Sequence, residues 1–215
     1  MSGVAIRPYE PRDRPAVREI CCDTADNGGP MESFFPDREL LADLVTRYYT
    51  DYEPQSAWVA ERDSAVVGYL TGCLDTARFR RVMAWRIVPV LLGKALARGT
   101  PWHPQVRALL RANAGDWFRG GLRSGVSLAE YPAHLHVDLL AATRGLGVGR
   151  ALMARWFDQV RAAGLRGIHA GVNADNTDGC RFFEAMGFTV LDRQSRMRLP
   201  DGRQVETLIY GRLLT

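Results

Sequence analysis

The chain has 215 residues, of which 47% are hydrophobic and 24% charged, and a formal net charge of +4 at pH 7. A chain of this size and composition can bury one large core, so we expect a single globular domain over residues 1–215. There is no run of about 18 apolar residues that would predict a membrane span. The first ten residues lack the layout of a signal peptide, so we predict a cytoplasmic protein with no membrane partner.

The cysteines are too few and too scattered to organise the fold. Cys21, Cys22, Cys73 and Cys180 form no CxxC pair, and no histidines stand at zinc spacing from them. We therefore expect buried or half-buried free thiols and no metal site.

The first 74 residues predict a strand, two helices and a hairpin. A short alternating run at residues 4–10 is typical of a strand. A helix should follow with Asp13 as its N-cap, and a second over residues 36–50, where leucines and tyrosines recur at helical spacing. Two apolar runs, at residues 58–60 and 65–74, then flank a polar turn and predict a hairpin.

Residues 75–133 differ from the rest of the chain, and we interpret them as a helical insertion within the domain. They contain three of the five tryptophans, several prolines and two helix-like pieces. The segment has a net charge of +7, because it holds ten basic residues and only three acidic ones. The basic residues are Arg78, Arg80, Arg81, Arg86, Lys94, Arg98, Arg107, Arg111, Arg119 and Arg123. Such a segment either attracts an anion or is a solvated helical surface, and both interpretations stay open.

The C-terminal part alternates strands and helices. Residues 134–140 alternate polar and apolar and predict a half-buried strand. A helix, a strand, a short helix capped by Asn176 or Thr177, and two strands joined by a Pro-Asp-Gly turn should follow. The whole order predicts an α/β (α+β) domain around one mixed sheet.

A glycine-rich stretch, ATRGLGVGRAL at residues 142–152, stands where a helix should begin. A helix N-terminus offers unpaired N–H groups and a positive dipole end, and glycines let a phosphate approach them. The stretch fits neither a P-loop, because no Lys-Ser or Lys-Thr follows, nor the GxGxxG dinucleotide motif with its acidic residue. It predicts a diphosphate cradle; the alternative is a tight turn without a ligand.

Two signatures together resemble the GNAT acetyltransferases. Arg144-Gly-Leu-Gly147-Val-Gly149 resembles the acyl-CoA pyrophosphate loop of that superfamily, and VNADNTDGCRFFEAMGF at residues 172–188 resembles its second signature. One helix and one strand separate them, as in the family, so the resemblance covers about residues 133–188. The run HLHVDLL, the insertion and the final strand pair further resemble bacterial acetyltransferases related to the C-terminal acetyltransferase-like domain of O-GlcNAc hydrolases.

The resemblance implies a fold and an activity. The fold would be a GNAT-like single domain, with a mixed, mostly antiparallel central sheet flanked by helices and a helical insertion at residues 75–133. The activity would be acetyl-CoA-dependent N-acetyl transfer to a primary amine by direct attack in a ternary complex, with acetyl-CoA as co-substrate. The acceptor would be an amine of a small molecule or of a protein.

The resemblance also assigns cofactor contacts. Main-chain groups of Asp138, Leu139 and Leu140 would pair with the pantetheine arm, and one N–H would polarise the thioester carbonyl. Asn176 would lie near the thiol end. The pyrophosphate would be held by the loop residues Arg144, Gly145, Leu146, Gly147, Val148, Gly149 and Arg150.

Phe183 is a departure from the family pattern. It stands where many members carry a tyrosine that protonates the leaving thiolate, and phenylalanine has no such proton, although it could pack against the cofactor. Either another group donates the proton, or CoA leaves as a thiolate, or the protein binds acyl-CoA without turnover. The last possibility, a catalytically inactive acyl-CoA-binding domain, is the alternative function.

The base that deprotonates the amine should come from the strand at residues 134–140. His134, His136 and Asp138 occupy alternate positions and so share one face. We predict His136 as the catalytic base and Asp138 as the second candidate, with His169 as a relay or a packed side chain. The alternative is that they are ordinary polar residues of a strand end.

The insertion bears on the partners. By resemblance it would cover the acceptor side of the cleft and bring Trp85, Trp102 and arginines to it, which favours an anionic or aromatic acceptor. The sequence has no RNA or DNA motif and no Lys-rich run, so a nucleic-acid partner is not favoured. The oligomeric state, including a homodimer, stays open.

Overall fold

The computed structural model describes residues 3–118, 125–199 and 202–214, and these build one seven-stranded sheet in the order β1-β2-β3-β4-β5-β7-β6. Only β4 and β5 are parallel; the other neighbours run antiparallel. The predicted mixed, mostly antiparallel sheet is confirmed. The strands are β1 (Ala5–Pro8), β2 (Ala57–Arg62), β3 (Ala65–Cys73), β4 (Ala133–Leu139), β5 (Gly167–Asn173), β6 (Thr189–Arg198) and β7 (Gln204–Leu213).

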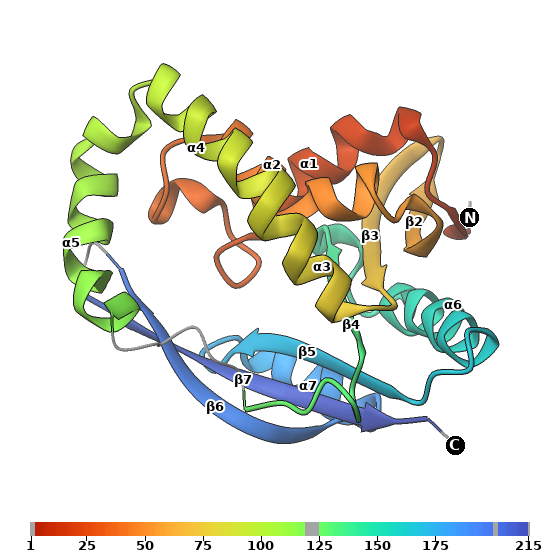
Figure 1. The fold of residues 1–215 in the computed structure, drawn as a ribbon. Helices are drawn as coiled ribbons and strands as arrows, with labels where there is room; N and C mark the ends of the chain where they lie inside the picture. Colours follow the sequence, from red (N-terminus) through yellow and green to blue (C-terminus); the bar gives the residue numbers. More distant parts are fainter. Residues whose placement is uncertain (1–2, 119–124, 200–201, 215) are drawn as a thin grey trace.

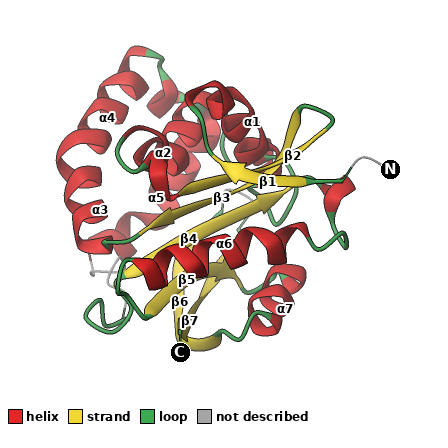
Figure 2. Ribbon diagram, turned by 90° about the vertical axis from the view of Figure 1, so that its right-hand side faces the viewer, coloured by secondary structure: helices red, strands yellow, loops and turns green. Residues whose placement is uncertain are grey.

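Helices cover both faces of this sheet. Helix α6 (Val148–Ala162) crosses one face, as Figure 2 shows, and α7 (Thr177–Ala185) lies beside it. The α6 side chains that enter the main core are spaced as the sequence predicts: Val148, Leu152, Trp156 and Val160. On the opposite face, α1 (Arg14–Thr24) packs against β2 and β3 and is covered by α2 (Arg38–Asp51).

The start of α1 differs in detail from the prediction. Asp13 does occupy the N-cap position, but its side chain does not cap α1. Because Pro11–Asp13 forms a 3₁₀ turn before the helix, the Asp13 carboxylate accepts the Glu10 N–H at 2.8 Å and pairs with the Arg7 guanidinium at 2.6 Å. Asp13 therefore links β1 to α1 rather than satisfying the helix end.

Of the segment predicted as helical, residues 76–118 are helical apart from short connections, whereas residues 125–132 are loop and turn. Helix α3 (Thr76–Val82) continues through a wide π turn (Met83–Ile87) into α4 (Val88–Ala97), and a short 3₁₀ turn (Thr100–Trp102) leads to α5 (Pro104–Phe118). These helices form an arch beside the sheet (Figure 1). Arg119 and Arg123 of the predicted basic set lie outside the described residues.

The inner face of this arch packs on α2. Phe79, Ile87 and Leu91 join Tyr48 and Tyr49 of α2 in a separate small core. The arch thus forms a third layer over α2, on the side of the sheet where the β4 histidines lie.

In the part of the chain that is described, no helix is both long and apolar enough to cross a bilayer.

The cysteines are free thiols, as the sequence predicts. Cys21, Cys22 and Cys73 are buried and Cys180 is half-buried. Burial raises the pKa of both the Cys21 and the Cys73 thiols to about 12. These two thiols are therefore core groups and stay protonated at neutral pH.

Candidate functional site

The sheet opens at its centre, on one side of β4. Six residue pairs join β4 to β3, but only two, Ala133 with Ile168 and His134 with His169, join it to β5. Beyond His134 the strands β4 and β5 diverge. This divergence leaves one edge of β4 unpaired by β5, on the strand whose main chain the GNAT resemblance assigns to the pantetheine arm.

The direction of the β4 amides follows from one hydrogen bond. The Leu140 N–H donates to the Val67 carbonyl at 3.0 Å, so this residue faces β3. Because hydrogen-bonding directions alternate along an antiparallel strand, Asp138 also faces β3, whereas Val137 and Leu139 face the opening. Of the three predicted positions, Leu139 thus presents its main chain to the opening, and Val137 is a position that the sequence reasoning missed.

The three glycines of the loop after β4 serve two different purposes. Gly145 and Gly147 both have φ of 76°, and a Cβ at either would meet no atom within 4 Å, so the space before them is open. A Cβ at Gly149 would instead lie 2.9 Å from the Phe182 ring, so this glycine allows close packing. Gly147 is the N-cap of α6, and the free N–H groups of that helix start face the loop.

The side chain of Arg144 does not lie in the loop. Its guanidinium rests against Gly28, where an added Cβ would be 2.2 Å away, and stands 3.9 Å from the Asp178 carboxylate. A hollow of about 400 Å³ lies beside the α6 start, between Leu146, Gly147 and the side chain of Arg62. The groups that face the open space at the α6 start are therefore main-chain amides rather than the Arg144 side chain.

Asn176 and Phe183, which the resemblance assigns to the cofactor, both contact other residues of the domain. The Asn176 side chain accepts the Gly179 N–H at 2.8 Å and so caps α7, one of the two caps that the sequence allows. Phe183 is 6% exposed and packs in the core against Phe188 and Tyr210. The ring that borders the β4 opening is Phe182, which the signature match to position 183 did not reveal.

At the other end of β4, His134 is held on both ring nitrogens. Thr76 Oγ1 lies 2.7 Å from Nδ1 and also 2.7 Å from the Pro132 carbonyl, to which it donates its proton. From this network we assign the Nδ1–H tautomer, with Nε2 accepting from the Tyr49 hydroxyl at 2.8 Å. Burial, with His136 nearby, lowers the pKa of His134 well below its usual value. His134 is a neutral, fully bonded side chain.

His136 shares the face of β4 with His134 but has a different environment. Its side chain is half-buried, the ring centroid is 5.7 Å from that of Tyr49, and the imidazole forms no hydrogen bond to any residue that the structure describes. Burial, with a smaller effect of His169, lowers the pKa of His136 to about 4. At neutral pH its imidazole is therefore uncharged and has a nitrogen that can accept a proton.

Asp138 lies on the same face, one step nearer the glycine loop. It accepts a hydrogen bond from the Tyr69 hydroxyl at 2.6 Å. Burial raises its pKa, although the bonds from Tyr69 and Thr24 act in the opposite direction. The structure thus brings the three predicted polar side chains onto one face, with His136 the one that has no protein hydrogen bond among the described residues.

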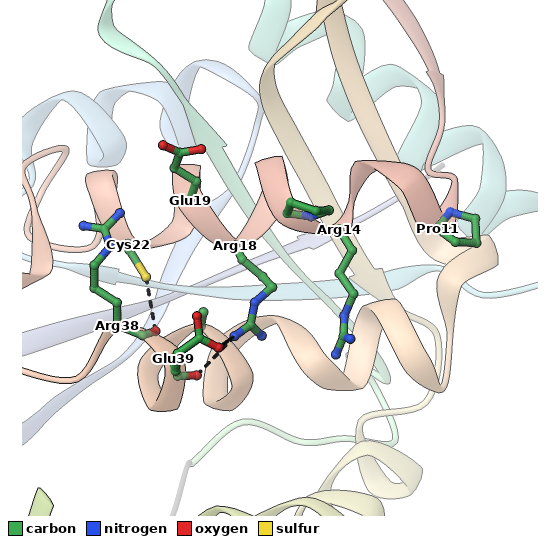
Figure 3. A pocket seen from close by; sticks show the side chains of 9 residues that line it. Pro11, Arg14, Arg18, Glu19, Cys22, Arg38 and Glu39 are labelled. Carbon is green, nitrogen blue, oxygen red and sulfur yellow. Dashed lines mark hydrogen bonds and ion pairs between the residues drawn. The ribbon is translucent and has the colours of Figure 1, made fainter. Parts of the chain in front are cut away.

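A second hollow, of about 510 Å³, lies between α1 and α2, away from this face (Figure 3). Its arginines are already paired with carboxylates. Arg18 pairs with Asp43 and Glu39. Arg38 pairs with Asp23 and Glu32. These ion pairs join α1 to α2 and to the turn between them.

Comparisons with known proteins agree with this geometry. The model of the Acetyltransferase (GNAT) family matches residues 124–188. Along 97% of its length the chain is 21% identical to Protein O-GlcNAcase of Rattus norvegicus, of which it spans 22%. A 98-residue stretch is 31% identical to the L-methionine sulfoximine/L-methionine sulfone acetyltransferase of Salmonella typhimurium and covers 44% of this chain and 52% of that protein. The chain therefore spans only about a fifth to a half of these relatives.

Solved structures resemble the whole described fold. The crystal structure of SsHAT superposes with a TM-score of 0.75 at 29% identity, over 98% of each chain. The yncA protein of Salmonella typhimurium, solved with its cofactor acetyl-CoA, gives a TM-score of 0.61 at 18% identity, over 99% of this chain and 95% of that one.

Fold and site thus define an α/β protein whose central sheet opens before a glycine-initiated helix, the arrangement of the acetyltransferase structures that it resembles. More specifically, residues 124–188 match the Acetyltransferase (GNAT) family, within a fold that is similar to SsHAT over 98% of the chain. Both resemblances drawn from the sequence, to the GNAT acetyltransferases and to the O-GlcNAc hydrolase group, are confirmed.

Proposed function

We propose that this domain is an acetyl-CoA-dependent N-acetyltransferase that acetylates a primary amine by direct attack in a ternary complex. The observation that carries the proposal is the opening between β4 and β5 beyond His134, which leads straight to the Gly147 cap of α6. The unpaired edge of β4 is followed in the chain by the N-terminus of α6. Together they offer a row of main-chain hydrogen-bond donors.

Acetyl-CoA fits the residues along this path. The main chains of Val137 and Leu139 would pair with the pantetheine arm, and the open left-handed positions Gly145 and Gly147 leave room for the pyrophosphate before the α6 amides. When bound, acetyl-CoA supplies an activated acetyl thioester. The contribution of the chain is to fix that thioester at the edge of β4, beside His136.

His136 is the proposed base. The neutral amine nitrogen forms a bond to the acetyl carbonyl carbon, the carbon–sulfur bond breaks, and the sulfur leaves with the electron pair. The amine proton passes to His136, directly or through a water molecule. Its lowered pKa keeps the imidazole unprotonated at neutral pH, so a ring nitrogen is free to accept the proton and to pass it on to solvent. Asp138, bound to Tyr69, is the second candidate for this role.

The leaving thiolate needs no donor on α7 in this scheme. Phe183 has no acidic proton and packs in the core, so we propose that CoA departs as a thiolate and is protonated by solvent. The same observation favours the second candidate function, an acyl-CoA-binding domain without turnover. The two functions differ only in whether an amine is acetylated.

The acceptor is proposed to carry a negative charge near its amine. Arg80 follows Thr76 by one helical turn, and Thr76 bonds His134, so the Arg80 guanidinium projects from the same side of α3 toward the histidines. Phe79, between them, packs its ring 4.7 Å from that of His134. An amino acid, like the substrate in the name of the Salmonella relative, and an acidic peptide both have this chemistry.

The test is release of free thiol from acetyl-CoA in the presence of amino acids, amino sugars, polyamines and a lysine peptide. The proposal expects release with at least one amine, and loss of release in His136→Gln with acetyl-CoA binding retained. Binding by calorimetry without release for any amine would establish the inactive alternative instead. Absence of binding would refute both functions.

A further inference from the structure

A tight turn after α1 contacts both flanks of the opening between β4 and β5. The end residues of this turn, Asp26–Gly29, exchange main-chain hydrogen bonds of 2.9 and 2.8 Å. Its central residues, Asn27 and Gly28, have φ of 53° and 92°, as in the tightest hairpin turns. The Asn173 side chain at the end of β5 donates to Asn27 Oδ1 at 3.1 Å, and Gly28 meets Arg144, which follows β4. The turn therefore joins the β5 flank to the β4 flank.

Glycine at position 28 has two structural reasons. Its φ of 92° is a left-handed value that residues with side chains rarely adopt. A Cβ at this position would also overlap a terminal nitrogen of the Arg144 guanidinium, so any other residue would displace that group. The position of the Arg144 side chain thus depends on a missing side chain in a different loop of the protein.

The Arg144 guanidinium is only loosely held in this position. It has five N–H donors, and none of them forms a hydrogen bond to a residue within the described ranges. The carboxylate that pairs with it, Asp178 on α7, is 3.9 Å away, and the two side chains are 47% and 77% exposed. Exposed ion pairs of this kind contribute little stability. The guanidinium can therefore leave the turn for a stronger acceptor.

Only the side chain of Arg144 has to move to reach a bound diphosphate. Its main-chain N–H donates to the Ala141 carbonyl at 3.1 Å, which fixes the backbone. The open space before α6 starts at the next residue, Gly145, where a Cβ would meet no atom within 4 Å. Arginine binds phosphate oxygens through a planar fork of donors, and such charge-assisted bonds are stronger than bonds between neutral groups. A diphosphate at the α6 amides would thus attract the guanidinium away from Gly28.

We propose that Gly28 is a positioning residue that holds the Arg144 guanidinium off the acyl-CoA path, and that the cofactor diphosphate draws it from the turn on binding. This inference rests on the proposed function, because it requires acetyl-CoA to bind before α6. The turn and the cofactor then compete for one cation. Contacts as exposed as these favour one side-chain position by up to about fivefold, so the apparent affinity for acetyl-CoA is lowered by the same factor.

The test is a double-mutant cycle on acetyl-CoA binding, measured by calorimetry in the wild type, Gly28→Ala, Arg144→Gln and the double variant. Gly28→Ala should bind acetyl-CoA up to about fivefold more tightly, because the competing position of the guanidinium is lost. In the Arg144→Gln background the same substitution should change the dissociation constant by less than about twofold. S-acetylpantetheine, which has no diphosphate, should bind alike to all four proteins.

Backbone strain needs its own control, because alanine at position 28 would have a positive φ. Gly99→Ala introduces a comparable strain in the arch: Gly99 has φ of 70° and no atom within 4 Å of an added Cβ. It should leave the affinity for acetyl-CoA unchanged. Thermal unfolding of both variants checks that the domain stays folded.

A second variant avoids strain altogether. Asp178→Asn removes the carboxylate beside the guanidinium and should tighten acetyl-CoA binding about twofold, again only while Arg144 is present. Asp175→Asn makes the same charge change at an exposed position just before α7 and is the matched control. Its effect should not depend on Arg144. Asp178→Asn therefore decides the question if Gly28→Ala does not fold.

The outcomes separate this inference from the proposed function. Unchanged or weaker binding of acetyl-CoA by folded Gly28→Ala would overturn the inference and leave the function intact. Tighter binding that persists in the Arg144→Gln background would also overturn it, because the effect would not pass through the guanidinium. Absence of acetyl-CoA binding in the wild type would refute the proposed function, and the inference with it.

Discussion

The two ends of β4 present different kinds of chemical group. At its C-terminal end, the site consists of main-chain groups along Leu139, the left-handed glycines and the start of α6. At its N-terminal end, it consists of side chains from several elements, with His134 held between Tyr49 of α2 and Thr76 of α3. In the proposed function, the first end would present donors to a feature that every acyl-CoA shares, and the second would set what the acceptor meets. Under that proposal, cofactor recognition is local in sequence, whereas acceptor recognition depends on the tertiary fold.

The largest effect is expected where the two ends meet, at His136. His136→Ala should lower kcat by about 10²–10⁴-fold, because the amine loses its proton acceptor. The affinity for acetyl-CoA should stay within about twofold, since the cofactor contacts are main-chain groups. Steady-state kinetics and calorimetry on the same variant measure both. An unchanged kcat would shift the role to Asp138, with Asp138→Asn as the next variant.

The second largest effect is expected in the glycine loop before α6. Gly147→Val should raise the dissociation constant for acetyl-CoA about 100-fold, because a side chain would fill the open space before the α6 amides. Gly164→Val is the matched control: Gly164 ends α6 with φ of 71° and also has no atom within 4 Å of an added Cβ. Both variants carry the same backbone strain, so equal losses of affinity would mean that strain, not blocked access, is responsible.

The buried histidine predicts a pH dependence of stability. The pKa of His134 is lowered in the folded chain, so below about pH 6.5 the unfolded chain binds a proton that the folded chain does not. Stability is therefore lost as the pH falls, by up to about 1.4 kcal/mol per pH unit for this residue. Urea unfolding of His134→Gln between pH 7 and pH 5 should show a shallower slope than the wild type. An identical slope would mean that His134 titrates normally.

The smallest effect concerns the acceptor. Arg80→Glu should raise the KM for an anionic acceptor several-fold, on the order of 1 kcal/mol, with little change for a neutral amine. Arg155→Glu, which makes the same charge change at an exposed position of α6, should change neither KM. If both variants behaved alike, the net charge of the chain rather than the position of Arg80 would explain the effect.

The same contrast explains how far the sequence could predict this molecule. The helix start within the glycine stretch, the α6 face and the Asn176 cap depend on residues a few positions apart, and each is observed as predicted or as one of the predicted options. The Tyr49–His134 bond joins residues 85 positions apart, and no local pattern indicates it. The position of Phe183 in the core likewise depends on Tyr210, which lies outside the signature at residues 172–188.

The Gly28–Arg144 contact is a further case of this kind. The sequence predicts Arg144 as a phosphate ligand, yet its guanidinium lies against a turn that follows α1 and near Asp178 of α7. Gly28 has φ of 92° and leaves the room that the guanidinium occupies. A role for the Arg144 side chain in binding therefore requires it to leave these neighbours, whereas its main chain stays part of the loop.

The most direct measurement is a calorimetric comparison of acetyl-CoA with S-acetylpantetheine, which keeps the thioester and the pantetheine arm but lacks the pyrophosphate. If main-chain amides before α6 bind that diphosphate, acetyl-CoA should bind with measurable heat and S-acetylpantetheine at least about 100-fold more weakly. Equal affinity for both molecules, or no heat with acetyl-CoA, would contradict the account.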